Sequence, residues 1–209
     1  MKIAVVCANG KEGQLIVKEA VARGFDVTAF VRGENKSEAK KFVSKDAFTL
    51  NAADFADFDV VVDAFGAWTA ETIPGIAKEM KVLGAALDGT KKRLVVVGGA
   101  GSLFVNKEHT LTVADGADFP ESWKPLAASH AEGLEYLRGT KNLEWTYISP
   151  AADFQAEGER TGSYILAGED FTINEKGESK ISYADFAIAL VDEIEKGNHL
   201  RERISVLAK

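Results

Sequence analysis

The chain has little cysteine and no long apolar run, and each of these absences excludes a class of protein. Cys7 is the only cysteine among 209 residues, so neither an intrachain disulfide nor a cysteine-rich metal site can form. We therefore expect a reducing, cytoplasmic location and no bound metal. No stretch approaches the roughly 20 apolar residues of a membrane span. The apolar start of the chain also meets Asn9 and Gly10 too soon to form the core of a signal peptide.

Positive charge is also in short supply. The chain has 25 Lys and Arg against 32 Asp and Glu, which gives a net charge of −7 and a pI near 5.1. This balance opposes attraction to phosphate backbones and anionic lipid, so nucleic acid and membranes are not expected partners. Hydrophobic residues make up 46% of the chain, enough for a packed core. We expect a small-molecule partner, and the sequence leaves the oligomeric state open, a homodimer included.

Short apolar strands alternate with helical stretches over the first 150 residues. The apolar run at residues 3–7 ends at Gly10, and Gly24 ends a helix expected at residues 11–23. Because the strands are apolar enough to be buried on both faces, this alternation predicts an α/β fold: a Rossmann-like, doubly wound parallel sheet with helices on both faces. Further strands are expected at residues 26–31, 47–50, 59–65, 93–97 and 145–149, and further helices at 36–43, 71–87 and 126–138.

The pattern changes after Pro150. Ser182, with Asp185 three residues on, resembles a capping box at the start of a helix over residues 182–195. No repeat, low-complexity tract or Pro- or Ser-rich linker divides the chain, so we expect one NAD(P)-binding domain over residues 1–209, as the motifs below indicate. Its residues from about 151 to 209 would form a small C-terminal lobe that completes the substrate pocket. Short strands are expected at residues 163–166, 170–174 and 204–207, while residues 98–125 show no periodicity and indicate either a functional loop or a wrong assignment.

The first strand runs directly into a glycine-containing turn that opens a helix. Glycines let the backbone approach a pyrophosphate, and the free amides and dipole of a helix N-terminus stabilise its charge. An ordinary turn that happens to contain two glycines is the alternative. The position of this turn, at the first βα junction of an α/β repeat, favours a dinucleotide cofactor. The predicted cofactor-binding residues here are Ala8, Asn9, Gly10, Lys11, Glu12 and Gly13.

The end of the second strand bears on which dinucleotide is bound. An acidic residue here suits an unphosphorylated ribose, whereas an arginine suits the 2′-phosphate of NADP. Arg32 can bind a phosphate through two parallel hydrogen bonds, and Lys36 or Lys11 could add a second charge. Two alternatives stand against this: Glu34 could serve an unphosphorylated ribose, and Arg32 could be an ordinary exposed side chain. The sequence favours NADPH over NADH as the cofactor.

Several distinctive segments together resemble an atypical short-chain dehydrogenase/reductase. By similarity the chain is identified as a member of the NADH-flavin reductase group, related to the biliverdin/flavin reductases and the NmrA-like NAD(P)-binding proteins. The resemblance extends over nearly the whole chain and rests on residues 8–13, 30–32, 63–66, 97–103, 149–154, 158–162 and 181–185. It implies that Ala64, Phe65 and Gly66 lie against the adenosine half of the cofactor, that Gly98 and Gly99 line its nicotinamide end, and that Ser149, Pro150 and Ala151 close over that end.

The turn departs from the family pattern in two places. Cys7 stands where the family usually has glycine, and Asn9 stands where it usually has threonine. Cys7 adds a side chain where this tight turn is normally bare, which the backbone tolerates only if the φ angle is negative. A thiol facing the core is the expected role of Cys7, in preference to a redox role.

The chain also lacks the Tyr-x-x-x-Lys pair with which the larger superfamily protonates its substrates. His130 stands on the helix where that pair would be expected, and it could hydrogen-bond the cofactor, relay a proton, or be an ordinary polar helix residue. Ser102 is a second catalytic candidate, for orienting the substrate, unless it only shapes a glycine-rich turn.

The missing acid indicates the kind of acceptor. Carbonyl reduction needs a proton as the alkoxide forms, whereas a flavin or quinone accepts hydride onto a delocalised system and can take its proton from water. The sequence therefore predicts an NAD(P)H-dependent reductase that transfers hydride to a flavin, a quinone or a similar planar conjugated acceptor. The alternative is an NmrA-like sensor, which binds the dinucleotide and reports its redox state without turnover.

Overall fold

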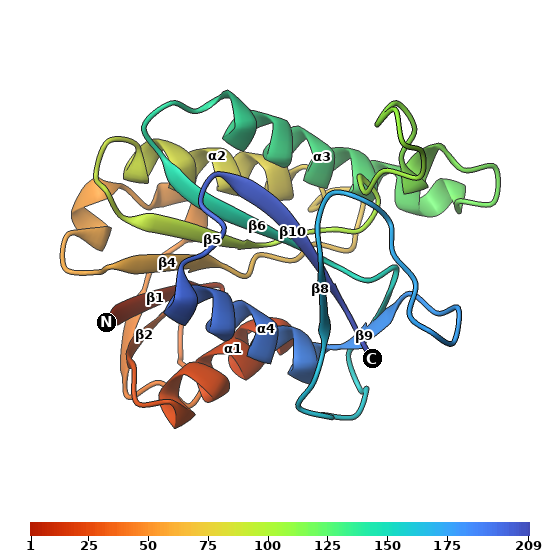
Figure 1. Cartoon of the computed structure of the whole chain (residues 1–209). Helices are drawn as coiled ribbons and strands as arrows, with labels where there is room; N and C mark the ends of the chain where they lie inside the picture. The colour runs from red at the N-terminus through yellow and green to blue at the C-terminus, as the bar shows by residue number, and fades with distance from the viewer.

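The structure of the protein is a computed structural model that describes residues 1–209. Eight strands form one sheet in the order β3-β2-β1-β4-β5-β6-β10-β8, in which all neighbours run parallel except β10 and β8. This topology confirms the predicted Rossmann-like, doubly wound α/β fold (Figure 1). The strands of the sheet are β1 (Lys2–Val6), β2 (Asp26–Val31), β3 (Lys41–Ser44), β4 (Val60–Asp63), β5 (Arg93–Val97), β6 (Glu144–Pro150), β8 (Ile165–Ala167) and β10 (Glu202–Leu207).

Two pairs of helices cover the two faces of this sheet. Helices α1 (Lys11–Ala22) and α4 (Tyr183–Lys196) lie side by side on one face, and α2 (Gly75–Leu87) and α3 (Lys124–Gly139) lie on the other (Figure 1). None of these helices is both long and apolar enough to cross a membrane.

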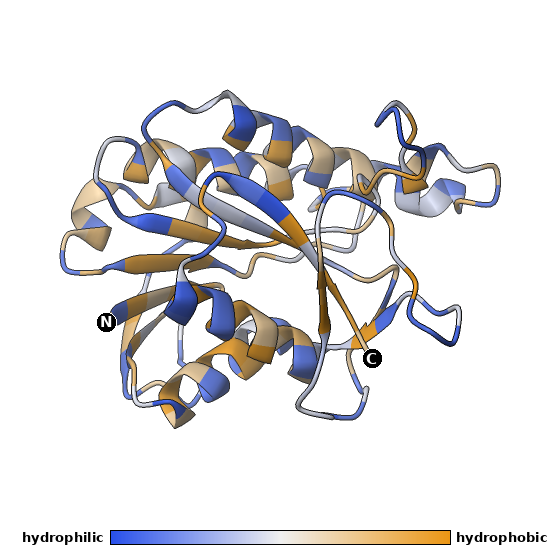
Figure 2. Ribbon diagram, viewed as in Figure 1, coloured by the Kyte–Doolittle hydropathy of each residue, from blue (hydrophilic) through white to orange (hydrophobic).

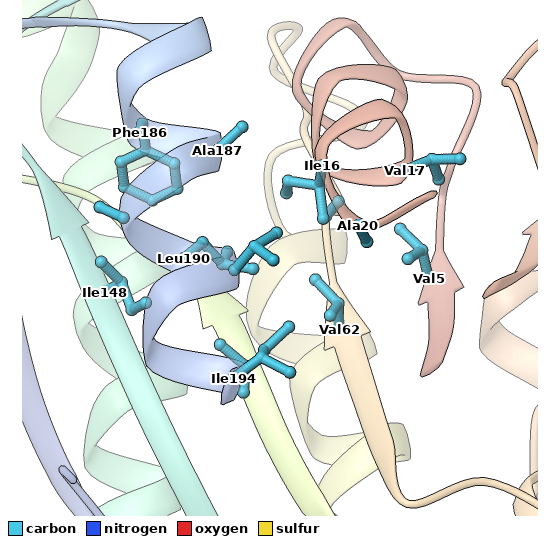
Figure 3. Packing of buried hydrophobic residues seen from close by; sticks show 14 of the residues in the cluster. Val5, Ile16, Val17, Ala20, Val62, Ile148, Phe186, Ala187, Leu190 and Ile194 are labelled. Atoms are coloured by element: carbon cyan, nitrogen blue, oxygen red, sulfur yellow. The ribbon is translucent and has the colours of Figure 1, made fainter. Parts of the chain in front are cut away.

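Because both faces are covered, every side chain of a central strand has a core to enter. Ile3 and Val5 of β1 belong to a cluster of 26 buried residues on the α1 and α4 side, while Ala4 and Val6 belong to a cluster of 20 on the other side. Figure 2 accordingly shows strands that are largely hydrophobic and helices that turn hydrophilic residues outward. Close up, Ile16 of α1 and Leu190 of α4 point toward the strands that carry Val62 and Ile148 (Figure 3).

The helix predicted at residues 36–43 is wrong. Asn35 closes a tight turn instead: its side-chain oxygen accepts the N–H of Ser37 at 3.0 Å, and its amide donates to the Ala39 carbonyl at 2.8 Å. Local bonds of this kind compete with a helix. The chain then extends as β3 at the edge of the sheet, where Phe42 is 53% exposed. The edge strand is only half covered, so its sequence is polar, and this polar pattern resembles that of a polar helix.

Two strand predictions are also wrong. Residues 47–50 contain a short 3₁₀ helix, η1 (Ala47–Thr49), because the Asp46 side chain accepts the N–H of Phe48 at 2.9 Å and caps it. Residues 170–174 contribute only an isolated bridge between Asp170 and Phe104. A second 3₁₀ helix, η2 (Ala52–Phe55), follows the first.

The C-terminal part of the chain is built into the main sheet, since β10 lies between β6 and β8. The cap predicted for α4 is confirmed, with the Ser182 hydroxyl accepting the Asp185 N–H at 3.0 Å. The sequence pattern missed a separate parallel pair, β7 (Asp153–Gln155) and β9 (Lys180–Ser182), whose strands are too short to show alternation.

Residues 98–125 form a long loop at one end of the sheet, with the 3₁₀ helices η3 (Val113–Asp115) and η4 (Glu121–Trp123) (Figure 1). Phe104 anchors it: its N–H donates to the Glu169 carbonyl at 3.0 Å, and the Arg203 guanidinium lies 5.5 Å from the centre of its ring. The loop is therefore tied to the C-terminal part of the chain.

The junction of β1 and α1 depends on a glycine. A Cβ atom at Gly13 would lie 2.7 Å from the carbonyl oxygen of Cys7 and 3.0 Å from the Cα of Ala8. Both are main-chain atoms, so no side chain can move aside to make room. The same carbonyl accepts the N–H of Gly10 at 2.9 Å. Gly13 therefore lets α1 begin directly against the end of β1.

Cys7 does not meet the condition of a negative φ. Its φ is 59°, in the left-handed region, which a side chain adopts only at some cost in free energy. The thiol packs against the core cluster on the α2 and α3 side, which recovers part of that cost. Burial raises the pKa of the thiol, so it remains protonated at neutral pH.

We predict that Gly13→Ala lowers the free energy of unfolding by about 1 to 3 kcal/mol, the usual cost of overpacking. Helix propensity alone predicts the opposite sign, since alanine is the better helix former. Gly139→Ala is the matched control, because a Cβ there meets nothing within 4 Å, and it should leave stability unchanged or raise it. Urea unfolding of the three proteins measures the difference. A Gly13→Ala protein as stable as the unmodified chain would show that the close approach is not a constraint.

Candidate cofactor site

A cavity of about 600 Å³ lies at the carboxyl ends of β1, β2, β4 and β5. This is where the strand order reverses: from β1 the chain proceeds outward to β2 and β3 on one side, and then crosses to β4 on the other. The connections that leave neighbouring strands diverge at such a point and open a crevice, which is where open α/β sheets bind ligands. The volume is within the range of small-molecule and cofactor sites.

The cavity brings together more than half of the residues that the sequence proposes for the site. They come from the turn after β1, the end of β2, the segment after β4, the end of β5 and helix α3. These residues are Asn9, Gly10, Lys11, Glu12, Arg32, Ala64, Phe65, Gly66, Gly98 and His130.

The remaining candidates lie outside the cavity wall. The Ser102 hydroxyl accepts a hydrogen bond from Arg203 at 3.2 Å, so it belongs to the anchor of the long loop and does not meet His130. Lys36 approaches only through its backbone, whose N–H donates to the Asn9 side chain at 2.7 Å. The others, which support the wall from behind or lie in the core, are Ala8, Gly13, Gly99, Ser149, Pro150 and Ala151.

The N-terminus of α1 faces the cavity without a cap. Gly10 is the N-cap residue and no side chain hydrogen-bonds to the first turn. The neighbouring Asn9 does not serve, because its side chain bonds the Glu34 carbonyl and the Lys36 N–H. The backbone amides and the positive end of the helix dipole are therefore available to an anion, as a pyrophosphate requires. The residues present thus fit the phosphate groups of a dinucleotide.

Arg32 lines the cavity at the end of β2, the strand next to β1. Its guanidinium lines the cavity and has no hydrogen bond or ion pair within the chain. Lys45 also lines the cavity, but its ammonium group bonds both carboxylate oxygens of Asp54 at 2.7 Å. The rival acid Glu34 does not contribute to the wall. Arg32 is thus the cation at this end with its hydrogen bonds still unused.

The end of the cavity at Gly98 is shaped by two aromatic side chains. A Cβ at Gly98 would lie 2.2 Å from the Tyr147 ring, and a Cβ at Gly99 would lie 3.0 Å from the His130 ring. These glycines therefore make room for Tyr147 and His130. Sequence reasoning missed Tyr147, because a tyrosine inside an apolar strand is normally a core residue.

Tyr147 lies within hydrogen-bond distance of His130. Its hydroxyl oxygen accepts the Gly99 N–H at 2.9 Å, and it lies 3.3 Å from Nδ1 of His130. The hydroxyl has both a proton and a second lone pair for Nδ1, so which of the two groups donates depends on the tautomer of the imidazole. Burial lowers the pKa of His130 to about 4, so the ring is neutral at neutral pH. His130 therefore adds an uncharged polar group to the cavity wall.

A second buried pair lies directly behind the segment after β4. Asp63 accepts the N–H of Phe65 at 2.9 Å and so fixes the start of that segment. Glu79, on α2, is fully buried, is offered no N–H or O–H donor by the protein, and faces the Asp63 carboxyl. Burial raises the pKa of both groups, and the backbone bond favours the charged form of Asp63. We place the shared proton on Glu79. Sequence reasoning missed Glu79, although a charged residue on the apolar face of α2 could have indicated it.

The fold and the site define a protein that binds a nicotinamide dinucleotide. The chain belongs to the NAD(P)H-binding family, whose pattern matches residues 7–196.

Three relatives are similar to this chain over almost their whole length. SP1627 of Streptococcus pneumoniae TIGR4, which carries the provisional description NADH-flavin reductase, is 55% identical with a TM-score of 0.98 over the whole of both chains. YwnB of Bacillus subtilis, described as uncharacterized, is 42% identical over all of this chain and 99% of its own. A protein of Bacteroides thetaiotaomicron, provisionally described as an epimerase, is 34% identical with a TM-score of 0.85, covering 99% of this chain and 96% of its own.

We predict that the free energy of unfolding of a Glu79→Gln protein increases relative to that of the unmodified protein as pH rises. The pKa of Glu79 is raised in the folded state. The stability that Glu79 contributes is therefore present below its pKa in the unfolded state, near 4.5, and is lost as pH rises toward its pKa in the folded state. A glutamine donates to Asp63 at every pH. Between pH 5 and pH 8 the difference in unfolding free energy should shift by more than about 1 kcal/mol in favour of the variant.

Urea unfolding at the two pH values measures this shift. Glu175→Gln, at an exposed position, is the matched control and should follow the pH profile of the unmodified protein. If the Glu79→Gln profile also runs parallel to it, Glu79 does not hold the proton.

Proposed function

We propose that the protein is an NADPH-dependent reductase that passes hydride to a flavin, a quinone or a similar planar conjugated acceptor. The observation that carries this proposal is the chemistry of the Gly98 end of the cavity. His130 is neutral there, and no Tyr-x-x-x-Lys pair exists in the chain. The description of the pneumococcal relative as an NADH-flavin reductase is consistent with it.

The cofactor supplies the hydride, and the residues of this chain bind and orient it. The uncapped first turn of α1 suits the pyrophosphate, and the unpaired Arg32 suits a 2′-phosphate. Ala64, Phe65 and Gly66 follow β4, on the other side of β1 from β2, and line the same cavity, and the family resemblance assigns them to the adenosine. In the tautomer whose Nδ1 accepts the Tyr147 hydroxyl, His130 would offer its Nε2–H beside Gly98.

A delocalised acceptor suits this end because it does not need an acid there. Tyr147 cannot replace the missing tyrosine, since burial raises the pKa of its hydroxyl and no lysine lies four residues on. A flavin or quinone can take its proton from water. Carbonyl substrates rank lower for the same reason.

The direct test is NADPH consumption with a panel of flavins, quinones, aldehydes and ketones. We expect turnover with flavins or quinones and little with the carbonyl compounds. Tight NADPH binding with no turnover on any of them would contradict the proposal and favour the NmrA-like sensor.

We predict that the protein binds NADPH more tightly than NADH and that Arg32→Asp reverses this order. A charge-assisted bond to phosphate contributes about 1.5 to 3 kcal/mol, which corresponds to roughly ten- to a hundredfold in affinity. Calorimetric titration of both proteins with both cofactors measures the preference. Lys18→Asp is a suitable control, because Lys18 is exposed and outside the cavity. Equal affinity of the unmodified protein for NADH and NADPH would remove the role given to Arg32.

We predict that His130→Ala slows the limiting rate by clearly less than the roughly 10²- to 10⁴-fold expected for loss of a general acid. A ring with a pKa of about 4 is not an imidazolium at neutral pH, and the N–H of a neutral imidazole is too weak an acid to act as a general acid, so the main effect of His130 should be on binding. Steady-state kinetics and a binding titration separate the two effects. A 10³-fold fall in the limiting rate with cofactor affinity intact would make His130 the proton donor and reopen carbonyl substrates.

A further inference from the structure

Glu12, in the first turn of α1, carries a carboxyl group without a partner. The residue is 7% exposed, both carboxyl oxygens are shielded, and neither has a hydrogen-bond partner in the protein. Glu12 nevertheless contributes to the cavity wall, as do Phe154 and Tyr183. Buried polar groups in native proteins are almost always hydrogen-bonded, so an orphaned carboxyl beside a ligand cavity calls for a partner outside the chain.

The chain itself offers no such partner. The neighbouring ammonium of Lys11 is paired with Glu157 at 3.0 Å. An ionised glutamate is normally favourable in the first turn of a helix. Here burial raises the pKa of Glu12 well above its ordinary value, and a pyrophosphate on the same helix terminus would oppose a negative charge further. With no hydrogen-bond partner inside the chain, burial favours the neutral carboxylic acid, whose O–H would be an unused donor.

We propose that Glu12 binds the dinucleotide as a neutral carboxylic acid, with its O–H donating a hydrogen bond to an oxygen of the cofactor. The cofactor's phosphates and its carboxamide carry such oxygens, and a carboxylate has no proton to donate to them. Because both carboxyl oxygens are shielded, the O–H would be presented to the cofactor by rotation about the side-chain bonds of Glu12. Dinucleotide binding and retention of this proton are then coupled. The inference rests on dinucleotide binding, the property of the family, and not on turnover.

Few other groups can produce the same pH dependence. Tyr183, on α4, is a near neighbour: burial raises the pKa of its hydroxyl, so it stays neutral. The exposed pair of Lys11 and Glu157 adds no net charge. The remaining titratable or charged side chains of the wall are Cys7, Arg32, Lys45, Asp46 and His130.

The test is the dissociation constant of the cofactor between pH 6 and pH 9.5, measured by fluorescence titration. NADH is used beside NADPH because a 2′-phosphate titrates near pH 6 on its own. For the unmodified protein we expect the dissociation constant to rise with pH, by up to tenfold per pH unit, above the pKa of Glu12 in the free protein. Glu12→Gln keeps a donor at every pH and should bind with this dependence removed. Glu12→Leu has no donor and should bind about tenfold or more weakly at neutral pH.

Two controls make the result specific to Glu12. Glu157→Gln removes the neighbouring exposed carboxylate and should leave the pH dependence in place. The carbon-13 shift of the Glu12 carboxyl reports its protonation directly in the unmodified protein, with and without cofactor, and should show a neutral acid at pH 7 in both. Parallel pH profiles for the unmodified protein and Glu12→Gln, an ionised Glu12 at pH 7, or full affinity in Glu12→Leu would each overturn the proposal.

These measurements need no acceptor and are independent of the proposed reductase. Proton-coupled binding without turnover would support the role of Glu12 and contradict the proposed reductase activity. Turnover with pH-independent binding would do the reverse.

Discussion

The close approach of α1 to the end of β1 is the constraint on which the rest of the site depends. At Gly13 the helix touches the main chain of Cys7 and Ala8, with no room for even a methyl group. Because the helix begins there without a capping side chain, its first amides open onto the crevice where the strand order reverses. Gly13 thus determines both how α1 packs on the core and where its first amides face the cavity. Cys7, held at a positive φ, shows that the chain accepts local strain to keep this junction.

The cavity joins regions of different electrostatic character. At the Arg32 end a guanidinium remains without a partner, in a protein whose net charge is −7. Toward Gly98 the polar groups are held neutral by burial, since the pKa of His130 is lowered and that of Tyr147 is raised. An anionic cofactor can therefore be held by its phosphates at one end while its reactive ring meets uncharged groups at the other. Such a ring environment favours hydride transfer to a delocalised acceptor over acid-assisted reduction of a carbonyl.

Local patterns in the sequence predicted the parts of the fold that are buried on both faces. The strands and helices that surround the cavity have strong periodicity, so their order and the position of the glycine turn followed from it. The pattern failed where one face is open or where a side chain closes a turn, as at β3 and Asn35, because polarity there reports exposure and not helical period. Tyr147, Glu79 and the unpaired state of Glu12 depend on contacts between distant segments, and no local pattern reveals them.

We propose that the dinucleotide lies along this cavity with its adenosine end at Arg32 and its nicotinamide at Gly98. A crystal structure of the complex with NADPH is the direct test of this orientation. We expect the 2′-phosphate on Arg32, the pyrophosphate on the first turn of α1, and the nicotinamide ring beside Gly98 and His130. A nicotinamide ring at the Arg32 end, or a dinucleotide bound away from the α1 N-terminus, would contradict it.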